Sequence, residues 1–185
     1  MPLTAAQLTT LKNDINADPT LSAYPNNVDG NIAIAQAYNL LAAPDFFVYR
    51  TNAPVAEIFD QVTWANFTPA DAPDTTVQWT NRSLACQGKQ FNLQIITQGR
   101  ETVNAAKTNI RAGLQDALTG LPSGTGGTTR TANWVGVRDN VLARKATRAE
   151  KLFASGGTGA NAQNAATMGV EGDLQYTDVE LARNS

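Results

Sequence analysis

The stretch "KLFASGGTGANAQNAATMGVEGDLQYTDVELARNS", residues 151–185, decides how the chain is expected to fold. It follows a basic segment with a helical pattern, and then stays small, polar and glycine-rich for about thirty residues, longer than an ordinary loop. Apolar residues nevertheless recur in step at Met168, Val170, Leu174 and Tyr176. In an extended chain these side chains share one edge. Because a lone strand is unstable in water, this edge needs a partner.

Two partners are open to this segment: the helices of its own chain, or a second polypeptide. We expect the second, with residues 154–185 forming a flexible, extended C-terminal arm that docks by strand addition or in a groove. The glycine-rich first part of the arm supplies reach, since a dozen extended residues span roughly 40 Å. The expected interface side chains of the arm are Met168, Val170, Leu174, Tyr176 and Val179.

The remainder of the chain has helical periodicity. Thr4 followed by Gln7 is a capping-box pattern before an apolar stripe, which predicts a first helix that ends near Asp18. An aromatic, extended connector is expected at 46–50. Further helices are expected near 31–43, 54–62, 75–97, 102–119 and 131–153. The helix at 75–97 carries its apolar stripe at Val77, Leu84, Phe91 and Ile95. The sequence therefore predicts an all-α fold, a compact bundle of five to six helices over residues 1–153 with an extended C-terminal arm.

Charge is segregated along the chain, although the net charge is only −2. Residues 1–75 carry two basic and eight acidic side chains, residues 76–151 carry eleven and four, and residues 152–185 carry one and four. Such blocks pair within one fold, or they pair between copies around a ring or along a stack. Both arrangements remain open from the sequence. The hydrophobic fraction of 42% is enough for a core.

The residue types exclude several kinds of chemistry. The chain has no histidine and a single cysteine, Cys86, which removes disulfides, imidazole or thiolate metal sites and Ser-His or Cys-His nucleophiles. The stretches "SGTGGTT" and "ASGGTGA" lack the order of a phosphate-binding loop. The carboxylate pairs Asp71/Asp74 and Glu171/Asp173 have no partner base. We therefore expect no enzyme activity, no cofactor and no metal, and Cys86 in a core.

Five basic residues cluster late in the last expected helix: Arg138, Arg144, Lys145, Arg148 and Lys151. The cluster has three interpretations. It is a solvated helix end that is partly paired with nearby acids and favoured by the helix dipole, a docking surface for an acidic protein face, or a contact to DNA phosphates. No aromatic residues are interleaved with the basic ones, which counts against the contact to DNA. No export signal and no membrane-spanning run of apolar residues is present, so we expect synthesis in the cytoplasm and no membrane contact.

Two parts of the sequence form long patterns, "LTAAQLTTLKNDINADPTLSAYPNNVDGNIAIAQAYNLLAAPDFFVYRT" near its start and "LARKATRAEKLFASGGTG" with "MGVEGDLQYTDV" near its end. They resemble the opening pattern and the C-terminal signature of a family of small tailed-phage and prophage virion proteins. The resemblance covers residues 1–65 and 138–180, and its motifs are structural rather than catalytic.

The resemblance implies a structural protein of the virion at the head–tail junction. Helical proteins of this size in short-tailed phages form a ring of adaptor subunits that links the portal to the tail. The expectation is thus a head–tail adaptor in the neck, a homo-oligomer (a dodecamer) whose arm clasps the portal protein or a neighbouring copy. A tail or nozzle protein lies on its other side, and packaged DNA makes a passing contact. The alternatives are a head-completion or capsid-decorating protein and, in another class, a DNA-binding packaging or regulatory protein.

Overall fold

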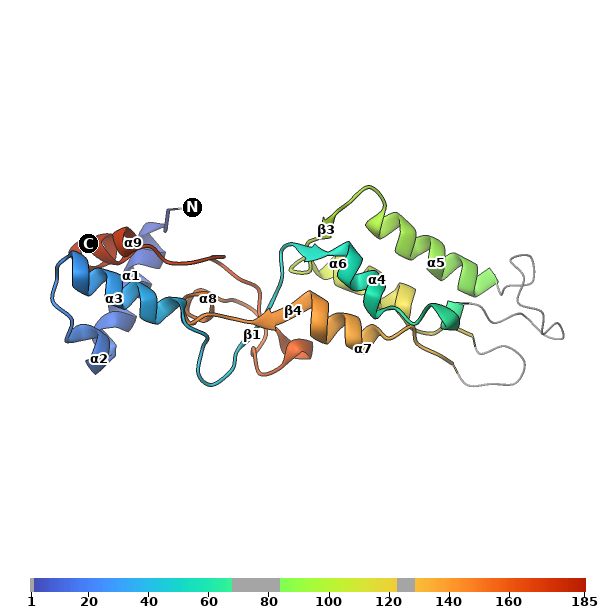
Figure 1. Cartoon of the computed structure of the whole chain (residues 1–185), viewed down its shortest axis with the longest axis horizontal. Coiled ribbons are helices and arrows are strands. Elements are labelled where there is room, and N and C mark those ends of the chain that lie inside the picture. Colours follow the sequence, from blue (N-terminus) through green and yellow to red (C-terminus); the bar gives the residue numbers. More distant parts are fainter. Residues whose placement is uncertain (1, 68–83, 123–128) are drawn as a thin grey trace. The chain divides into compact units, whose positions relative to one another are not determined.

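The structure is a computed structural model that describes residues 2–67, 84–122 and 129–185 (Figure 1). The helix expected at 75–97 is therefore described only from residue 84. The sequence predictions for Val77, the pair Asp71/Asp74 and the glycine-rich stretch at 123–128 lie outside the described residues.

The chain divides into two compact units. Unit 1 combines residues 1–48 with residues 145–185, and unit 2 consists of residues 49–144. The sequence predicts a boundary between residues 153 and 154 instead. The two divisions differ because the C-terminal segment packs with the N-terminal helices rather than extending from the domain.

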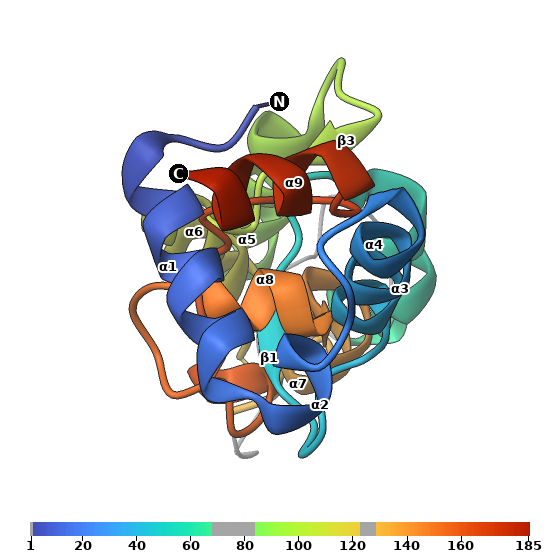
Figure 2. The ribbon, with the colours of Figure 1, turned by 90° about the vertical axis from the view of Figure 1, so that its left-hand side faces the viewer.

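Unit 1 is built on helices from both ends of the chain. Its elements are α1 (Ala5–Ala17), α2 (Pro19–Ser22), α3 (Val28–Asn39), α8 (Arg148–Leu152), a short 3-10 turn η4 (Ala162–Asn164) and α9 (Tyr176–Asn184). The predicted capping box of α1 is confirmed, since Thr4 and Gln7 bond each other reciprocally. α9 packs against both α1 and α3 (Figure 2). The buried apolar residues between these helices are Leu11, Ile15, Leu21, Ile34, Ala35, Tyr38, Ala149, Leu174, Val179 and Ala182.

The prediction of an extended arm is wrong at its C-terminal end. Tyr176 begins α9 instead of continuing a strand, and the side chains of Leu174 and Val179 are buried in the core of unit 1. The cause is a second helix cap, in which the Asp178 carboxylate accepts from the backbone N–H of Gln175 (3.0 Å). This cap starts a helix whose buried face is completed by α1 and α3 of the same chain.

The glycine-rich stretch before α9 is a packed loop rather than an extended joint. The backbone N–H of Phe47 donates to the carbonyl of Gly159 (2.8 Å), and the N–H of Ala166 donates to the carbonyl of Phe47 (2.9 Å). Gly159 has φ +65°, and a Cβ there would lie 2.2 Å from the ring of Phe46. Only glycine fits this close approach. The loop therefore satisfies both backbone polar groups of Phe47 within unit 1.

Unit 2 is a second small helical body. It contains β2 (Ala53–Pro54), α4 (Val55–Gln61), a 3-10 turn η1 (Trp64–Phe67), α5 (Leu84–Thr97), β3 (Thr102–Val103), α6 (Thr108–Leu118), α7 (Trp134–Val137) and a π-helical turn η3 (Arg138–Leu142). β2 and β3 are antiparallel, with Ala53 opposite Val103. α5 packs against α6. It buries Cys86, Leu93 and Thr97, whereas Leu84, Phe91 and Ile95 of the stripe predicted from the sequence face outward.

The prediction of one long basic helix at 131–153 is also wrong. It is divided into α7, η3, the strand β4 (Ala143–Lys145) and α8. β4 pairs with β1 (Phe47–Tyr49), and the flanking bonds run from Ala146 N to Phe46 O and from Arg50 N to Leu142 O. Pairing with β1 thus outweighs the helical periodicity of this segment. In the part of the chain that the structure describes, the protein is predominantly helical with two small two-stranded sheets, so it is not clearly a pure all-α bundle.

Candidate functional site

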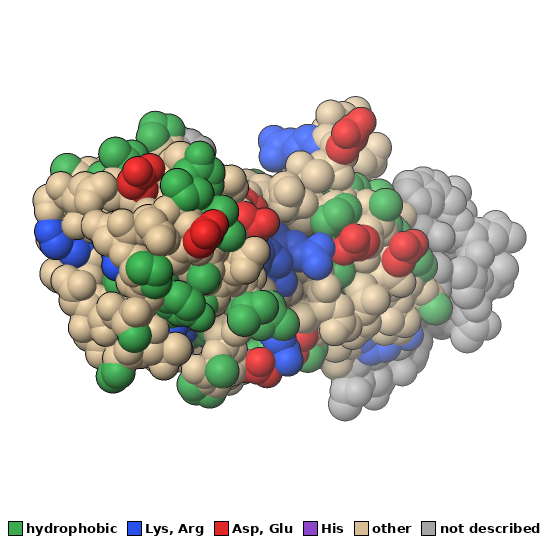
Figure 3. All heavy atoms as spheres, turned by 60° about the vertical axis from the view of Figure 1, so that its left-hand side comes forward, with side chains coloured by type: hydrophobic (Ala, Val, Ile, Leu, Met, Phe, Trp, Pro, Cys, Tyr) green, Lys and Arg blue, Asp and Glu red, His purple; other side chains and the backbone are tan. Residues whose placement is uncertain are grey.

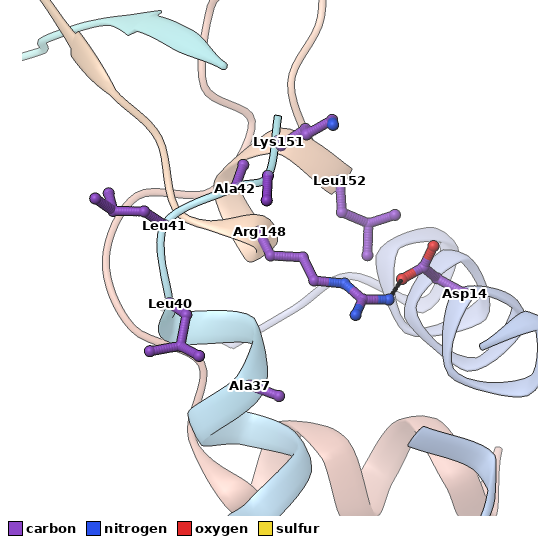
Figure 4. A pocket seen from close by; sticks show the side chains of 9 residues that line it. Asp14, Ala37, Leu40, Leu41, Ala42, Arg148, Lys151 and Leu152 are labelled. Carbon is purple, nitrogen blue, oxygen red and sulfur yellow. Dashed lines mark hydrogen bonds and ion pairs between the residues drawn. The ribbon is translucent and has the colours of Figure 1, made fainter. Parts of the chain in front are cut away.

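A pocket of about 550 Å³ opens on unit 1 between the end of α3 and the helices α1 and α8 (Figure 4). Arg148 reaches from α8 toward Asp14 on α1, while the chain after α3 supplies the opposite side. Its lining combines three charged side chains with small and apolar ones. The lining residues are Asp14, Ala37, Leu40, Leu41, Ala42, Ala43, Arg148, Lys151 and Leu152.

The guanidinium of Arg148 organises one side of this pocket. It forms ion pairs with the carboxylates of Asp14 and Asp18, each at 2.9 Å, and lies 4.6 Å from the centre of the Tyr38 ring. The Tyr38 hydroxyl donates to the Asp14 carboxylate. Asp18 also caps α2 by accepting from the backbone of Thr20 and Leu21. The network therefore ties α8 to α1, α2 and α3.

Three groups of this network have shifted pKa values. Burial, followed by the hydrogen bond to Asp14, raises the pKa of Tyr38 well above its ordinary value. The hydrogen bond from Arg148 lowers the pKa of Asp18. Burial lowers the pKa of Arg148, but its bonds to Asp14 and Asp18 outweigh this and raise it. Tyr38, Asp18 and Arg148 thereby keep their ordinary charge states at neutral pH, and the ion pairs of Arg148 hold the helices together.

The opposite side of the pocket is made by residues that leave α3. The side-chain amide of Asn39 donates to the carbonyl of Leu174 (3.0 Å) and accepts from its N–H (2.8 Å). The helix ends at this residue, and Leu40 and Leu41 are then 68% and 61% exposed. Leu41 is thus outside the core, whereas Ile34 and Tyr38 of α3 are buried. Two adjacent exposed leucines beside a pocket suit contact with an apolar segment.

One charged side chain at this pocket has no carboxylate partner among the described residues. The Lys151 ammonium lies 5.7 Å from the centre of the Phe46 ring, a cation–π contact, and forms none of the described ion pairs. It is half-buried and lines the pocket. Arg148 is already neutralised, so Lys151 is the cation that can receive a carboxylate from a bound segment.

The five basic residues expected on one helix are not brought together on one surface. Arg138 bonds Asp139 at 2.6 Å beyond α7, Arg144 lies in β4, and Lys145 bonds Asp45 at 2.7 Å. Only Arg148 and Lys151 share the pocket. On the face drawn in Figure 3, Lys and Arg side chains lie beside Asp and Glu side chains rather than in one basic area. Part of the charge segregation in the sequence is therefore resolved by pairs within the chain.

The five expected arm residues are also separated. Leu174 and Val179 are in the core, Met168 packs on a small cluster of Val48, Ala146 and Ala166, and Val170 is half-buried. Tyr176 is 41% exposed at the start of α9. The sequence analysis missed the pocket because its residues come from both ends of the chain. The capping box of α8, Thr147 with Glu150, is the local signal that would have located its second half.

No family model, curated protein or solved structure matches the chain. Within the described residues no cluster of acidic or cysteine side chains is suited to hold a metal ion. No helix in the described part of the chain combines the length and hydrophobicity needed to cross a membrane.

Proposed function

We propose that the protein is a non-enzymatic structural protein of a virion, a subunit of the head–tail adaptor ring that links portal to tail. One observation carries the proposal. The two stretches that resemble virion proteins, residues 1–65 and 138–180, are largely the two stretches that fold together as unit 1. They jointly build the pocket with its exposed leucines.

The proposed contact differs from the arm expected from the sequence. The C-terminal segment is engaged in unit 1, so the docking surface is the pocket. An apolar segment of the portal protein inserts between Leu40 and Leu41 on one side and Leu152 on the other. A carboxylate of that segment pairs with Lys151. Such a site is apolar with few polar groups that fix orientation, as is usual for binding pockets.

Binding to purified portal rings encoded by the same genome tests this proposal. The wild-type chain is expected to co-sediment with the rings, and Leu41→Glu is expected to weaken binding by at least about tenfold, because it places a charge against an apolar partner. Leu181→Glu is the matched control, since Leu181 is 56% exposed on α9 of the same unit and does not line the pocket. A wild-type chain that does not bind portal rings contradicts the proposal, and so does a Leu41→Glu variant that binds them as tightly as wild type.

Other outcomes of the same assays identify the alternatives. Binding to assembled capsids but not to portal rings indicates a head-completion or capsid-decorating protein. Salt-dependent retention of duplex DNA, lost on joint replacement of Arg144, Lys145 and Arg148, indicates a DNA-binding protein.

A further inference from the structure

The short segment after α3 is a strand with one edge turned away from the rest of unit 1. Two backbone hydrogen bonds, of 2.9 and 3.0 Å, join residues 40–42 to residues 146–148. They form an antiparallel bridge in which Leu41 lies opposite Thr147, and both bonds use backbone groups of the residues next to Leu41. Successive residues of a strand direct their N–H and C=O groups to opposite sides. The N–H and C=O of Leu41 therefore point away from residues 146–148.

These two backbone groups of Leu41 are available to a partner. In the part of the chain that the structure describes, which includes unit 1 from residue 2 onward, neither group has a hydrogen bond. The residue is 61% exposed. An N–H and a C=O on an exposed strand edge are the groups to which an extended segment of another chain adds.

The available edge is limited to about one residue. Before Leu41, α3 ends at Asn39. After it, the chain bends at Ala43 and Pro44, and proline has no N–H to donate. An edge this short does not support open-ended strand pairing between copies. A strand added here exchanges two backbone hydrogen bonds with Leu41 and gains the rest of its binding free energy from side chains.

The pocket of unit 1 follows this edge. Four consecutive residues, 40–43, contribute to its lining. Because successive side chains of a strand face opposite ways, a cavity that touches four residues in a row runs along the strand. Figure 4 shows this segment across the pocket from Arg148 and Asp14. The backbone groups of Leu41 and the apolar lining thus lie within reach of a single bound segment.

Charge selects the occupant. Lys151 lines the same pocket, and its ammonium is in none of the described ion pairs. The bound segment therefore needs a carboxylate. A second copy that pairs through the same edge brings another lysine instead, because the carboxylate of its Asp14 is already bound by Arg148. The edge and its pocket fit a different protein better than a second copy.

From this geometry we infer that the pocket binds an extended segment of the portal protein as an added β-strand. One residue of that segment exchanges two backbone hydrogen bonds with Leu41, and a carboxylate of the segment pairs with Lys151. The inference rests on the proposed function and deepens it, because it assigns the conformation of the bound segment and the atoms that hold it. A helix docked in the same pocket has no backbone groups to offer, since they are bonded within the helix.

Leu41→Pro tests the backbone bond. Proline removes the N–H of residue 41, and Leu40 already has the extended conformation that a following proline requires (ψ 155°). Binding to portal rings is expected to weaken about tenfold more than in Leu41→Ala, which also removes the leucine side chain but keeps the N–H. Circular dichroism verifies that both variants are folded. Equal affinities of the two variants overturn the inference.

Hydrogen exchange of the wild-type chain measures the same bond without a substitution. The Leu41 amide is expected to exchange at least about tenfold more slowly on portal rings than in the free chain. The amide of Asn26 is the control, since it is exposed in the same unit, has no partner among the described residues and lies outside the pocket. Its exchange is expected to stay unchanged. A Leu41 amide that exchanges equally fast in both states overturns the inference.

The results separate this inference from the proposed function. A wild-type chain that does not bind portal rings overturns both. Binding that is weakened by Leu41→Glu, but shows neither effect at the Leu41 N–H, overturns the added strand and leaves the proposed function in place. Slow exchange of Leu41 that appears when the chain is concentrated without portal identifies a second copy as the occupant, and this outcome also overturns the inference.

Discussion

Arg148 shows how one residue connects the two ends of the chain. Its guanidinium is bound by Asp14 and Asp18 from the first helices and stacks on Tyr38 from α3. In the sequence it is one of several basic residues near the C-terminus, and nothing in its local spacing distinguishes it from Lys145. The distinction comes from the fold, which surrounds Arg148 with fixed partners and leaves the Lys145–Asp45 pair half exposed.

Replacing Arg148 by alanine is expected to destabilise unit 1 by about 1–3 kcal/mol, because two carboxylates lose their partner and the Tyr38 ring loses its contact. Lys145→Ala is the matched control and is expected to cost no more than about 0.5 kcal/mol. Urea unfolding followed by circular dichroism measures both. Similar losses for the two variants would contradict the role given to Arg148.

Stability is expected to depend on pH through Asp18. Its pKa lies below the ordinary value of 3.8, chiefly because of the hydrogen bond from Arg148. A lowered folded-state pKa contributes stability that is present above this ordinary value and is lost as the pH falls through the folded pKa. Asp18→Asn keeps the cap of α2 but removes the charge. The difference in urea midpoint between wild type and this variant is expected to be constant from about pH 5 to 7 and to shrink below about pH 4. A difference that persists unchanged to about pH 2 would contradict this explanation.

At the scale of elements, the sequence patterns located the helices and strands that depend on neighbouring residues. They failed for the elements that depend on pairing with distant segments of the chain. The capping box of α1, the extended connector at β1 and the short helix α4 follow from neighbouring residues, and all three are present. α5 shows the limit of periodicity. Its two stripes, at 84, 91, 95 and at 86, 93, 97, have identical spacing, so periodicity alone does not tell which one faces the core.

α9 is expected to be an integral part of unit 1. Val179→Ala is predicted to lower the free energy of unfolding by about 2 kcal/mol, because it leaves a cavity between α9 and its neighbours. Leu181→Ala, on the exposed side of the same helix, is predicted to change it by no more than about 0.5 kcal/mol. Thermal or urea unfolding measures the two values. If both variants are as stable as wild type, α9 is not part of the core.

Gly88→Ala is expected to stabilise unit 2 by about 0.5–1 kcal/mol. Glycine is a poor helix former, and among the described residues the added methyl group meets no atom within 4 Å. Gly113→Ala on α6 is the contrasting control, since a Cβ there would lie 2.8 Å from the Ile96 side chain and is expected to offset the gain. Urea unfolding measures both. A destabilised Gly88 variant would contradict the exposed position of this residue.

At the scale of the whole molecule, unit 1 is discontinuous in sequence and unit 2 is continuous. The candidate site in unit 1 was not predictable from the sequence for this reason, because Leu41 and Arg148 are brought together only when β4 pairs with β1 and returns the chain. The pattern near each end of the sequence predicts only the elements of that end. Because the pocket is lined by residues from both ends, no single segment of the sequence predicts it.

The division also predicts that unit 1 folds without unit 2. Residues 46 and 146, and residues 50 and 142, are joined by backbone hydrogen bonds, so the chain ends at residues 48 and 145 are close enough for a short turn. A chain that joins residues 1–48 to residues 145–185 through a two-residue Asn-Gly turn is expected to fold cooperatively, because its core and the Arg148 network are complete. Urea unfolding and the dispersion of its amide resonances measure this. The same chain with Val179→Asp is the control and is expected to unfold, because a buried charge has no partner there. A joined chain that is unfolded while residues 49–144 alone are folded would show that unit 1 depends on unit 2.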